Sequence, residues 1–289
     1  MATSFESTES RDLPVPDRQR SSAVSEVSNR TPVSRSIWRC VSLVVCLGLW
    51  QIATQYKVSL GFVTMANVPA PTDVAQAFWH LLHSPKLPMH LFASIVRVLF
   101  GFSAAAMVGV GFGLAIGRYR AFEDSVLPSL EVLRPIPAVA WIPLAILMFP
   151  SSEMSMMFIT FIGALFPILL NTIHGVEGID PRLVATARSL GTRRLSLFSE
   201  VIVPGAAPAI LTGLSIGMGT AWFCLITAEM IAGQYGIGYF TWESYTLQNY
   251  ADIVVGMLLI GALGMGSSVL VKRLGLALMP WYRLSEARR

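Results

Sequence analysis

The stretch VATARSLGTRRLSLFSEVIVPGA (residues 184–206) is a basic, amphipathic segment that lies between two long apolar segments. Its apolar residues recur at helical spacing on both sides of Gly191. This pattern predicts a helix, a break at the glycine and a second amphipathic helix. Pro204 then marks the approach to the next apolar segment. The meaning of this hairpin depends on what the flanking segments are.

The composition indicates a membrane protein. Of the 289 residues, 54% are hydrophobic and only 13% are charged, whereas soluble domains carry about 25% charged residues. The charges are also segregated, which leaves long uncharged stretches. These features predict an all-α, polytopic membrane protein.

Six membrane-spanning helices are predicted, since a helix needs about 20 residues to cross the hydrocarbon core. They are placed at 37–55, 91–116, 136–149, 154–173, 206–228 and 253–271. The third is short and contains Pro137 and Pro143, so we expect it to be kinked or broken.

The remaining segments divide the chain into a tail, a membrane domain and a second tail. Residues 1–35 are rich in Ser, Arg, Glu and Pro and are predicted to be a disordered cytoplasmic tail. Residues 36–282 form the membrane domain, and 283–289 a short cytoplasmic C-terminal tail. Within the domain, 72–83 is predicted to be an interfacial helix on the outer face, capped by Thr72. His80 and His83 on this helix lack a third ligand nearby, so no metal site is predicted.

The basic residues predict which loops face the cytoplasm. All but three of the 21 Lys and Arg residues fall in the N-terminal tail, the loop after the second span, the hairpin region and the C-terminus. The exceptions are Lys57, Lys86 and Arg97. The positive-inside rule therefore places both termini and the hairpin in the cytoplasm. Basic charge here sets topology, and nucleic-acid binding is not expected.

Small residues at four-residue spacing predict close helix packing in several spans. They are Gly109, Gly113 and Gly117 in the second, Gly213 and Gly217 in the fifth, and Gly261 near Gly264 in the sixth.

The sequence contains no G-x-x-x-x-G-K-[ST] motif, so this chain is not expected to bind ATP in the usual way. Arg97 and Glu229 lie toward the outer ends of spans, where we expect them to snorkel to water. A proton-coupled carrier is therefore poorly supported, and a membrane-embedded enzyme even less so.

Two interpretations of the hairpin are equally good on physical grounds. A helix–turn–helix can dock its apolar residues in a groove of a partner protein. It can also lie on the membrane surface and contact anionic lipid.

The spacing within the hairpin resembles the "EAA–G–LP" cytoplasmic loop of permease subunits in ABC importers, which forms the coupling helix that binds the ATPase subunit. The EAA positions hold Ala185, Thr186 and Ala187, so the acidic first residue is missing, and Val203-Pro204 occupies the LP place. The resemblance implies an ATPase-coupling role for Ala185, Thr186, Ala187, Arg188, Ser189, Gly191, Arg193 and Pro204 in the loop near 181–204.

The resemblance covers residues 65–282. Within this range, five phrases are similar to the nitrate/sulfonate/taurine/bicarbonate group of importer permeases. The matching phrases are LRPIPAVAWIPLAILMF (133–149), LFPILLNTIHGV (165–176), AWFCLITAEMI (221–231), GIGYFTWESY (236–245) and PW (280–281). It implies a type I ABC importer transmembrane domain in the bacterial cytoplasmic (inner) membrane. The implied partners are a second copy in a homodimer, two ATPase subunits that carry ATP and Mg, an extracytoplasmic binding protein and membrane lipid. No cofactor is expected on this chain itself.

In this group the spans after the hairpin usually line the pore, so the resemblance yields pore candidates. These are Ser215, Met218, Thr220, Trp222 and Glu229, together with Asn171 of the fourth span. Asn171, Ser215 and Thr220 could equally be hydrogen-bonding contacts between helices. Glu229 and Glu243 would make the outer mouth acidic, which favours selection of the anion by the binding protein.

The resemblance implies ATP-driven import of a small oxyanion or organosulfonate, namely nitrate, an aliphatic sulfonate, taurine or bicarbonate. The phrase GIGYFTWESY is more similar to the nitrate-like members of the group, whereas LFPILLNTIHGV is more similar to the sulfonate-like members. The alternative is an autonomous anion channel or secondary carrier.

Overall fold

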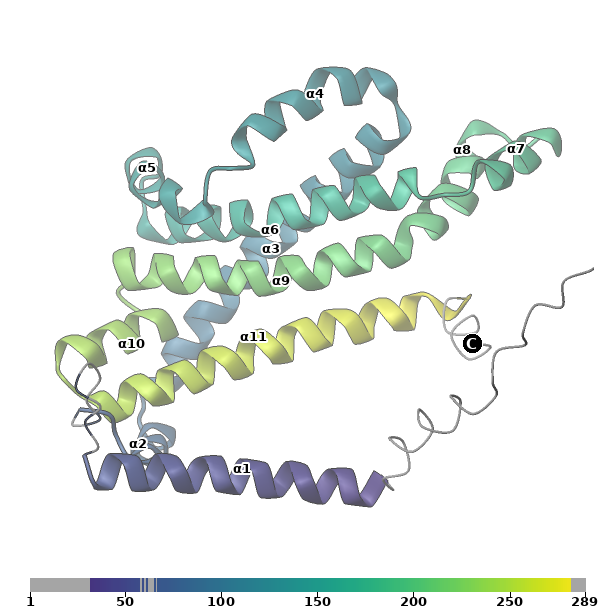
Figure 1. Ribbon diagram of the computed structural model, residues 1–289. Helices are drawn as coiled ribbons and strands as arrows, with labels where there is room; N and C mark the ends of the chain where they lie inside the picture. The colour runs from purple at the N-terminus through teal and green to yellow at the C-terminus, as the bar shows by residue number, and fades with distance from the viewer. Residues whose placement is uncertain (1–31, 58, 60, 62–64, 66, 282–289) are drawn as a thin grey trace, which may run out of the picture. The chain divides into compact units, whose positions relative to one another are not determined.

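The computed structural model describes residues 32–57, 59, 61, 65 and 67–281. The chain forms two compact units, residues 1–53 and residues 54–289. The first contains most of helix α1, and the second contains every other described helix (Figure 1).

Helices make up nearly all of the described chain. They are α1 (Pro32–Gln55), α2 (Pro71–Leu82), α3 (Leu87–Arg118), α4 (Arg120–Leu133), the 3-10 turn η3 (Ala138–Trp141), α5 (Ile142–Met148), α6 (Ser152–Glu177), α7 (Pro181–Ser189), α8 (Arg194–Leu197), the π-helical turn η4 (Phe198–Ile202), α9 (Val203–Ala232), α10 (Ile237–Thr246) and α11 (Tyr250–Leu278).

Four of the described helical stretches are long and apolar enough to cross a membrane. They are α3, α6, α9 together with its N-terminal extension (Arg194–Ala232), and α11. They contain the second, fourth, fifth and sixth predicted spans, whose helical character is confirmed. The first predicted span lies in α1, whose apolar stretch Cys40–Gln55 is shorter. The prediction of an all-α, polytopic membrane protein is confirmed.

The third predicted span is broken, as its prolines suggested. α4 and the η3–α5 segment meet at an angle of 84°, and together they account for a fifth candidate crossing. The prediction of a simple loop after the second span was wrong, because residues 120–133 form α4. The apolar side chains of Val126, Leu127 and Leu130 recur on one face of α4 and pack against α3 and α6.

The helix α6 is the centre of the second unit, because it packs against both α3 and α9 (Figure 1). Glycines make these contacts close. A Cβ atom on Gly113 would lie 2.6 Å from Cβ of Thr172, and one on Gly217 would lie 2.7 Å from Cγ1 of Ile168. Close packing is therefore confirmed for the second and fifth spans. In the sixth span it is not found at the predicted glycines, since no atom lies within 4 Å of a Cβ atom built on Gly261, and one on Gly264 would lie 3.9 Å from Cβ of Trp222. The close contact of this span is at Gly256, which packs against Thr241 of α10.

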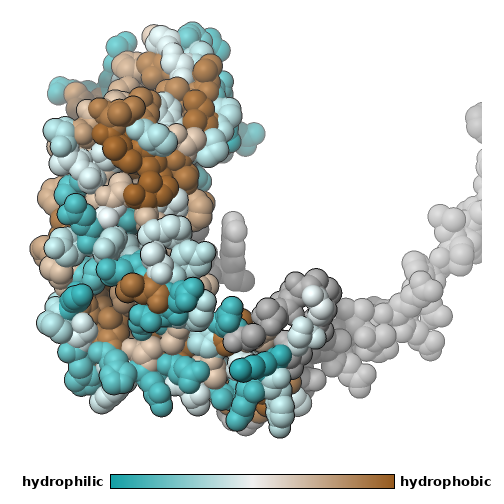
Figure 2. All heavy atoms as spheres, turned by 90° about the vertical axis from the view of Figure 1, so that its left-hand side faces the viewer, coloured by the Kyte–Doolittle hydropathy of each residue, from teal (hydrophilic) through white to brown (hydrophobic). Residues whose placement is uncertain are grey.

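The end of this unit that carries α5 and α10 is apolar over α5 and more hydrophilic elsewhere (Figure 2). Leu144, Leu147 and Met148 of α5 are exposed, Leu147 by 84%. Such a patch is suited to contact with lipid or with another apolar surface.

Two predicted boundaries differ from the structure. Of the predicted tail (residues 1–35), residues 1–31 lie outside the described residues. The helix α1 begins at Pro32, and proline is well suited to the start of a helix. The predicted tail of residues 283–289 also lies outside the described residues.

The helix predicted at 72–83 is α2, but its N-cap is Ala70 instead of Thr72. The Asp73 carboxylate accepts a hydrogen bond from the Ala70 N–H, at 3.2 Å.

Candidate functional site

The hairpin predicted at residues 184–206 is present, and local interactions define its first helix. α7 begins at Pro181, and the Asp180 carboxylate caps it by accepting a hydrogen bond from the Arg182 N–H, at 2.8 Å. It ends in a Schellman motif: Gly191 N–H donates to the Arg188 carbonyl and Thr192 N–H to the Ala187 carbonyl. Gly191 has φ +78°, in the left-handed region that favours glycine.

The second half of the hairpin is joined directly to the fifth span. α8 leads through the π-helical turn η4 into α9, and Arg194–Ala232 is a single helical stretch of 39 residues. Pro204 is the second residue of α9 and directly follows the π-helical turn, a local irregularity of the kind found where a proline interrupts the helical hydrogen bonds. The predicted second amphipathic helix is therefore an extension of the span.

The inner face of the hairpin is packed on the ends of the spans. Val176, Leu197, Ile202 and Ala206 form a buried cluster, and side chains of α3, α7 and η4 pack against it. This cluster therefore connects the hairpin to α6 and α9 by direct packing.

The outer face of the hairpin presents apolar side chains to the surroundings. Leu190 is 81% exposed and Leu195 is 83% exposed, one on each side of Gly191. Among the predicted coupling residues, Ala185, Thr186, Arg188, Ser189, Gly191 and Arg193 are exposed, whereas Ala187 and Pro204 are half-buried.

The predicted pore candidates divide into two groups. Met218, Trp222 and Glu229 are buried within this chain. Met218 belongs to the main core, and Trp222 Nε1–H donates to Ser267 Oγ of α11 at 2.8 Å. These side chains face neighbouring helices because α9 packs against α3, α6 and α11.

Asn171, Ser215 and Thr220 are half-buried, and each donates a hydrogen bond to a carbonyl of its own helix. Ser215 lies in GLSIG (213–217), which matches the G-x-S-x-G pattern of serine hydrolases. Here the pattern is in the middle of α9, not at the strand-to-helix turn that this chemistry requires.

The sequence analysis missed an exposed stripe along α9. Thr212, Ile216, Gly219 and Phe223 are all exposed and follow one another at spacings of four, three and four residues. Because apolar and small residues surround α9 on every side, periodicity could not distinguish this face from the buried ones.

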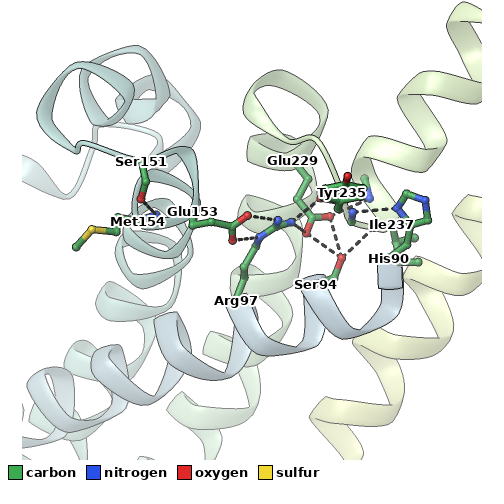
Figure 3. Close-up of polar contacts among 11 residues, drawn as sticks. His90, Ser94, Arg97, Ser151, Glu153, Met154, Glu229, Tyr235 and Ile237 are labelled. Carbon is green, nitrogen blue, oxygen red and sulfur yellow. Dashed lines mark hydrogen bonds and ion pairs between the residues drawn. The ribbon is translucent and has the colours of Figure 1, made fainter. Parts of the chain in front are cut away.

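A buried charge network lies at the end of the unit opposite the hairpin, centred on Arg97 of α3 (Figure 3). The Arg97 guanidinium donates to Glu153 of α6 through Nε (2.6 Å) and Nη2 (2.5 Å). Its Nη1 donates to Glu229 of α9 at 2.8 Å and to the carbonyl of Tyr235 at 2.6 Å. One side chain therefore connects α3, α6, α9 and the turn before α10.

Glu229 is surrounded by donors. Ser94 Oγ lies 2.8 and 3.0 Å from its two carboxylate oxygens, and Gly238 N–H donates to it at 2.9 Å. Gly236, at φ +127°, passes so close that a Cβ atom there would collide with the carboxylate. His90 Nδ1 accepts a hydrogen bond from Gly236 N–H at 3.1 Å and so holds the same turn (Figure 3).

The prediction that Arg97 and Glu229 snorkel to water was wrong. Arg97 is 2% exposed and Glu229 is fully buried. A buried charge requires a partner, and these two residues are partners of each other. Glu229 therefore faces Arg97 instead of an outer mouth. The rule that intramembrane charges of opposite sign pair with one another was the signal that could have found this contact.

Comparison with known proteins identifies the family. A family model described as "binding-protein-dependent transport system inner membrane component" matches residues 107–284. The aliphatic sulfonates transport permease protein SsuC of Escherichia coli, a putative assignment, is 38% identical over 89% of this chain and 98% of its own length.

Two further relatives are similar over most of the chain. The nitrate import permease protein NrtB of Synechocystis is 34% identical over 78% of this chain and 82% of its own length. A putative ABC transporter permease protein of Methanocaldococcus jannaschii is 40% identical over 70% of this chain and 77% of its own. The chain belongs to the family of binding-protein-dependent transport system inner membrane components, the permease subunits of ABC transporters.

Proposed function

We propose that this chain is the pore-forming subunit of an ATP-driven importer and that its hairpin receives the work of a separate ATPase subunit. The observation that carries this proposal is the exposure of Leu190 and Leu195 on a hairpin whose inner face is packed onto three spans. Apolar side chains that are more than four-fifths exposed are costly in water and favour a partner's groove.

The proposed assembly contains two copies of this chain, two ATPase subunits with ATP and Mg, and an extracytoplasmic binding protein. The hairpin and both termini face the cytoplasm of the bacterial inner membrane. The distribution of basic residues supports this orientation, because the hairpin and the C-terminal ends of α3 and α11 lie at the same end of the second unit (Figure 1). Arg118 is the last residue of α3, and Lys272 lies in the C-terminal part of α11.

The proposed substrate is a small oxyanion or an organosulfonate: nitrate, an aliphatic sulfonate, taurine or bicarbonate. The names of the relatives support this class, because one imports nitrate and another is assigned to aliphatic sulfonates. Selection of the anion is assigned to the binding protein. Glu229 is not the reason for this assignment, because it is buried and paired with Arg97 inside the chain.

The exposed stripe of α9 is the proposed pore-lining face. It contains Thr212, Gly219 and Phe223, and it is the face of α9 left open by α3, α6 and α11. Asn171, Ser215 and Thr220, which are half-buried, are the remaining candidates for contact with the pore.

Copurification tests the coupling role. We expect Leu190→Glu and Leu195→Glu to reduce the amount of ATPase subunit that copurifies with the permease, because a charge would enter the apolar contact. Leu247→Glu is the matched control, since Leu247 is 64% exposed at the opposite end of the unit. Equal recovery of the ATPase with all three variants would contradict the proposal.

A further inference from the structure

A cavity of about 340 Å³ lies at the base of the hairpin, and neither of the exposed leucines lines it. It is open to the surface and is lined by the end of α3, the end of α6, the helix α7 and the turn η4. Its volume falls within the range of small-molecule sites, which is about 300–1,000 Å³.

Two arginines line this cavity, Arg118 of α3 and Arg188 of α7. No acidic residue lines it. Among the residues that the structure describes, both ion pairs shorter than 4.0 Å belong to Arg97, so no described carboxylate neutralises Arg118 or Arg188 at that distance. Two positive side chains therefore share one cavity without an anionic partner from the described chain.

The other walls are mainly apolar, with Val176 and Ile202 among them. Apolar walls of low dielectric constant strengthen the attraction between a fixed cation and an anion beside them. They also offer a surface to an apolar group attached to the anion. The walls are well fixed, because a Cβ atom on Gly117 would lie 2.8 Å from Cβ of Val176, and Ile202 is buried in the hairpin cluster.

Space for an anion is available next to the arginines because residue 185 is an alanine. A longer side chain at this position would extend into the cavity. A glutamate there would place the chain's own carboxylate beside the two guanidinium groups.

We propose that this cavity binds a small soluble oxyanion that carries a short apolar group, such as an aliphatic sulfonate. The sulfonate oxygens accept hydrogen bonds from Arg118 and Arg188, and the alkyl group contacts Val176 and Ile202. Guanidinium groups suit this role because they donate two parallel hydrogen bonds to an oxyanion. The binding site follows from the cavity alone and does not depend on the transport function proposed above.

The bound anion would connect the end of α3 to the hairpin. A ligand that contacts both elements stabilises the arrangement in which they lie together, in proportion to its preference for that arrangement. If the hairpin moves during transport, as the proposed function requires, a high concentration of the anion on the hairpin side would slow that movement.

Calorimetric titration of the purified full-length chain tests the site, with sodium ethanesulfonate and inorganic phosphate as probes. We expect ethanesulfonate to bind more tightly than phosphate, because only ethanesulfonate has an apolar group. Arg118→Gln and Arg188→Gln should each weaken ethanesulfonate binding by about tenfold, the effect of losing one charged hydrogen bond. Arg194→Gln, an exposed hairpin arginine outside the cavity, should leave binding unchanged.

A second pair of variants tests the cavity without removing an arginine. Ala185→Glu should abolish ethanesulfonate binding, whereas Ala185→Ser should bind as the unchanged protein does. The proposal is overturned if the unchanged chain binds no ethanesulfonate, if both arginine variants bind it normally, or if Arg194→Gln weakens it equally. It is also overturned if phosphatidylglycerol vesicles eliminate the ethanesulfonate signal, because the occupant would then be a lipid headgroup.

Discussion

Arg97 holds two carboxylates that differ in their access to water. Glu229 is fully buried, whereas the side chain of Glu153 is 55% exposed. Water cannot take the place of Arg97 beside the buried Glu229 carboxylate, but it can do so beside the exposed Glu153 carboxylate. Glu229 should therefore matter more to stability than Glu153, even though both accept hydrogen bonds from the same guanidinium group.

Glu229→Gln should destabilise the folded protein by about 3 kcal/mol, because the buried Arg97 loses its only fully buried counter-charge and keeps only the half-exposed Glu153. Glu153→Gln is the matched control and should cost about 0–1 kcal/mol, as an exposed ion pair does. The midpoint of thermal unfolding in detergent measures both. Equal shifts in the two midpoints would show that the buried pair has no special role.

Position 236 requires glycine for two reasons. Its φ is positive, and the Glu229 carboxylate occupies the space that a side chain would need. Gly236→Ala should lower the thermal midpoint by displacing that carboxylate. Gly219→Ala is the comparison, because no atom lies within 4 Å of a Cβ atom there. It should be neutral, or stabilise α9 by up to about 1 kcal/mol. A midpoint for Gly236→Ala as high as that for Gly219→Ala would contradict this account.

At the scale of single elements, the hairpin could be predicted because its signals are local. The N–H groups of Gly191 and Thr192 end α7 by donating to carbonyls three and five residues earlier, respectively, and Pro204 is the second residue of α9, directly after the π-helical turn. The contact between Arg97 and Glu229 could not be predicted in this way, because 132 residues separate the two side chains. Only the packing of α3 and α9 on α6 brings them together.

The turn at Gly191 should tolerate asparagine better than valine. A β-branched residue at φ +78° costs about 1–2 kcal/mol, whereas asparagine adopts the left-handed region more easily. No atom lies within 4 Å of a Cβ atom there, so the difference is one of backbone strain and not of space. We expect Gly191→Val to lose the copurifying ATPase and Gly191→Asn to retain most of it. Full recovery with Gly191→Val would show that the Schellman turn is not required for coupling.

At the scale of the whole molecule, composition and hydropathy predicted the class of fold and the positions of most spans. They did not predict α4, whose residues 120–133 are too polar to resemble a span. They also did not show which face of α9 is open, because that face is defined by helices distant in sequence. The two ends of the second unit therefore have different features: the hairpin and its cavity at one, and the Arg97 network at the other (Figure 1).

Uptake of ethanesulfonate and nitrate into proteoliposomes tests most directly that this permease depends on a separate ATPase. The permease is reconstituted with and without the ATPase subunit and the binding protein, and with ATP or a non-hydrolysable analogue. We predict uptake only when both partners and hydrolysable ATP are present, and loss of that uptake with Leu190→Glu. Uptake by the permease alone, without ATP, would contradict this account and identify the chain as an autonomous channel or carrier.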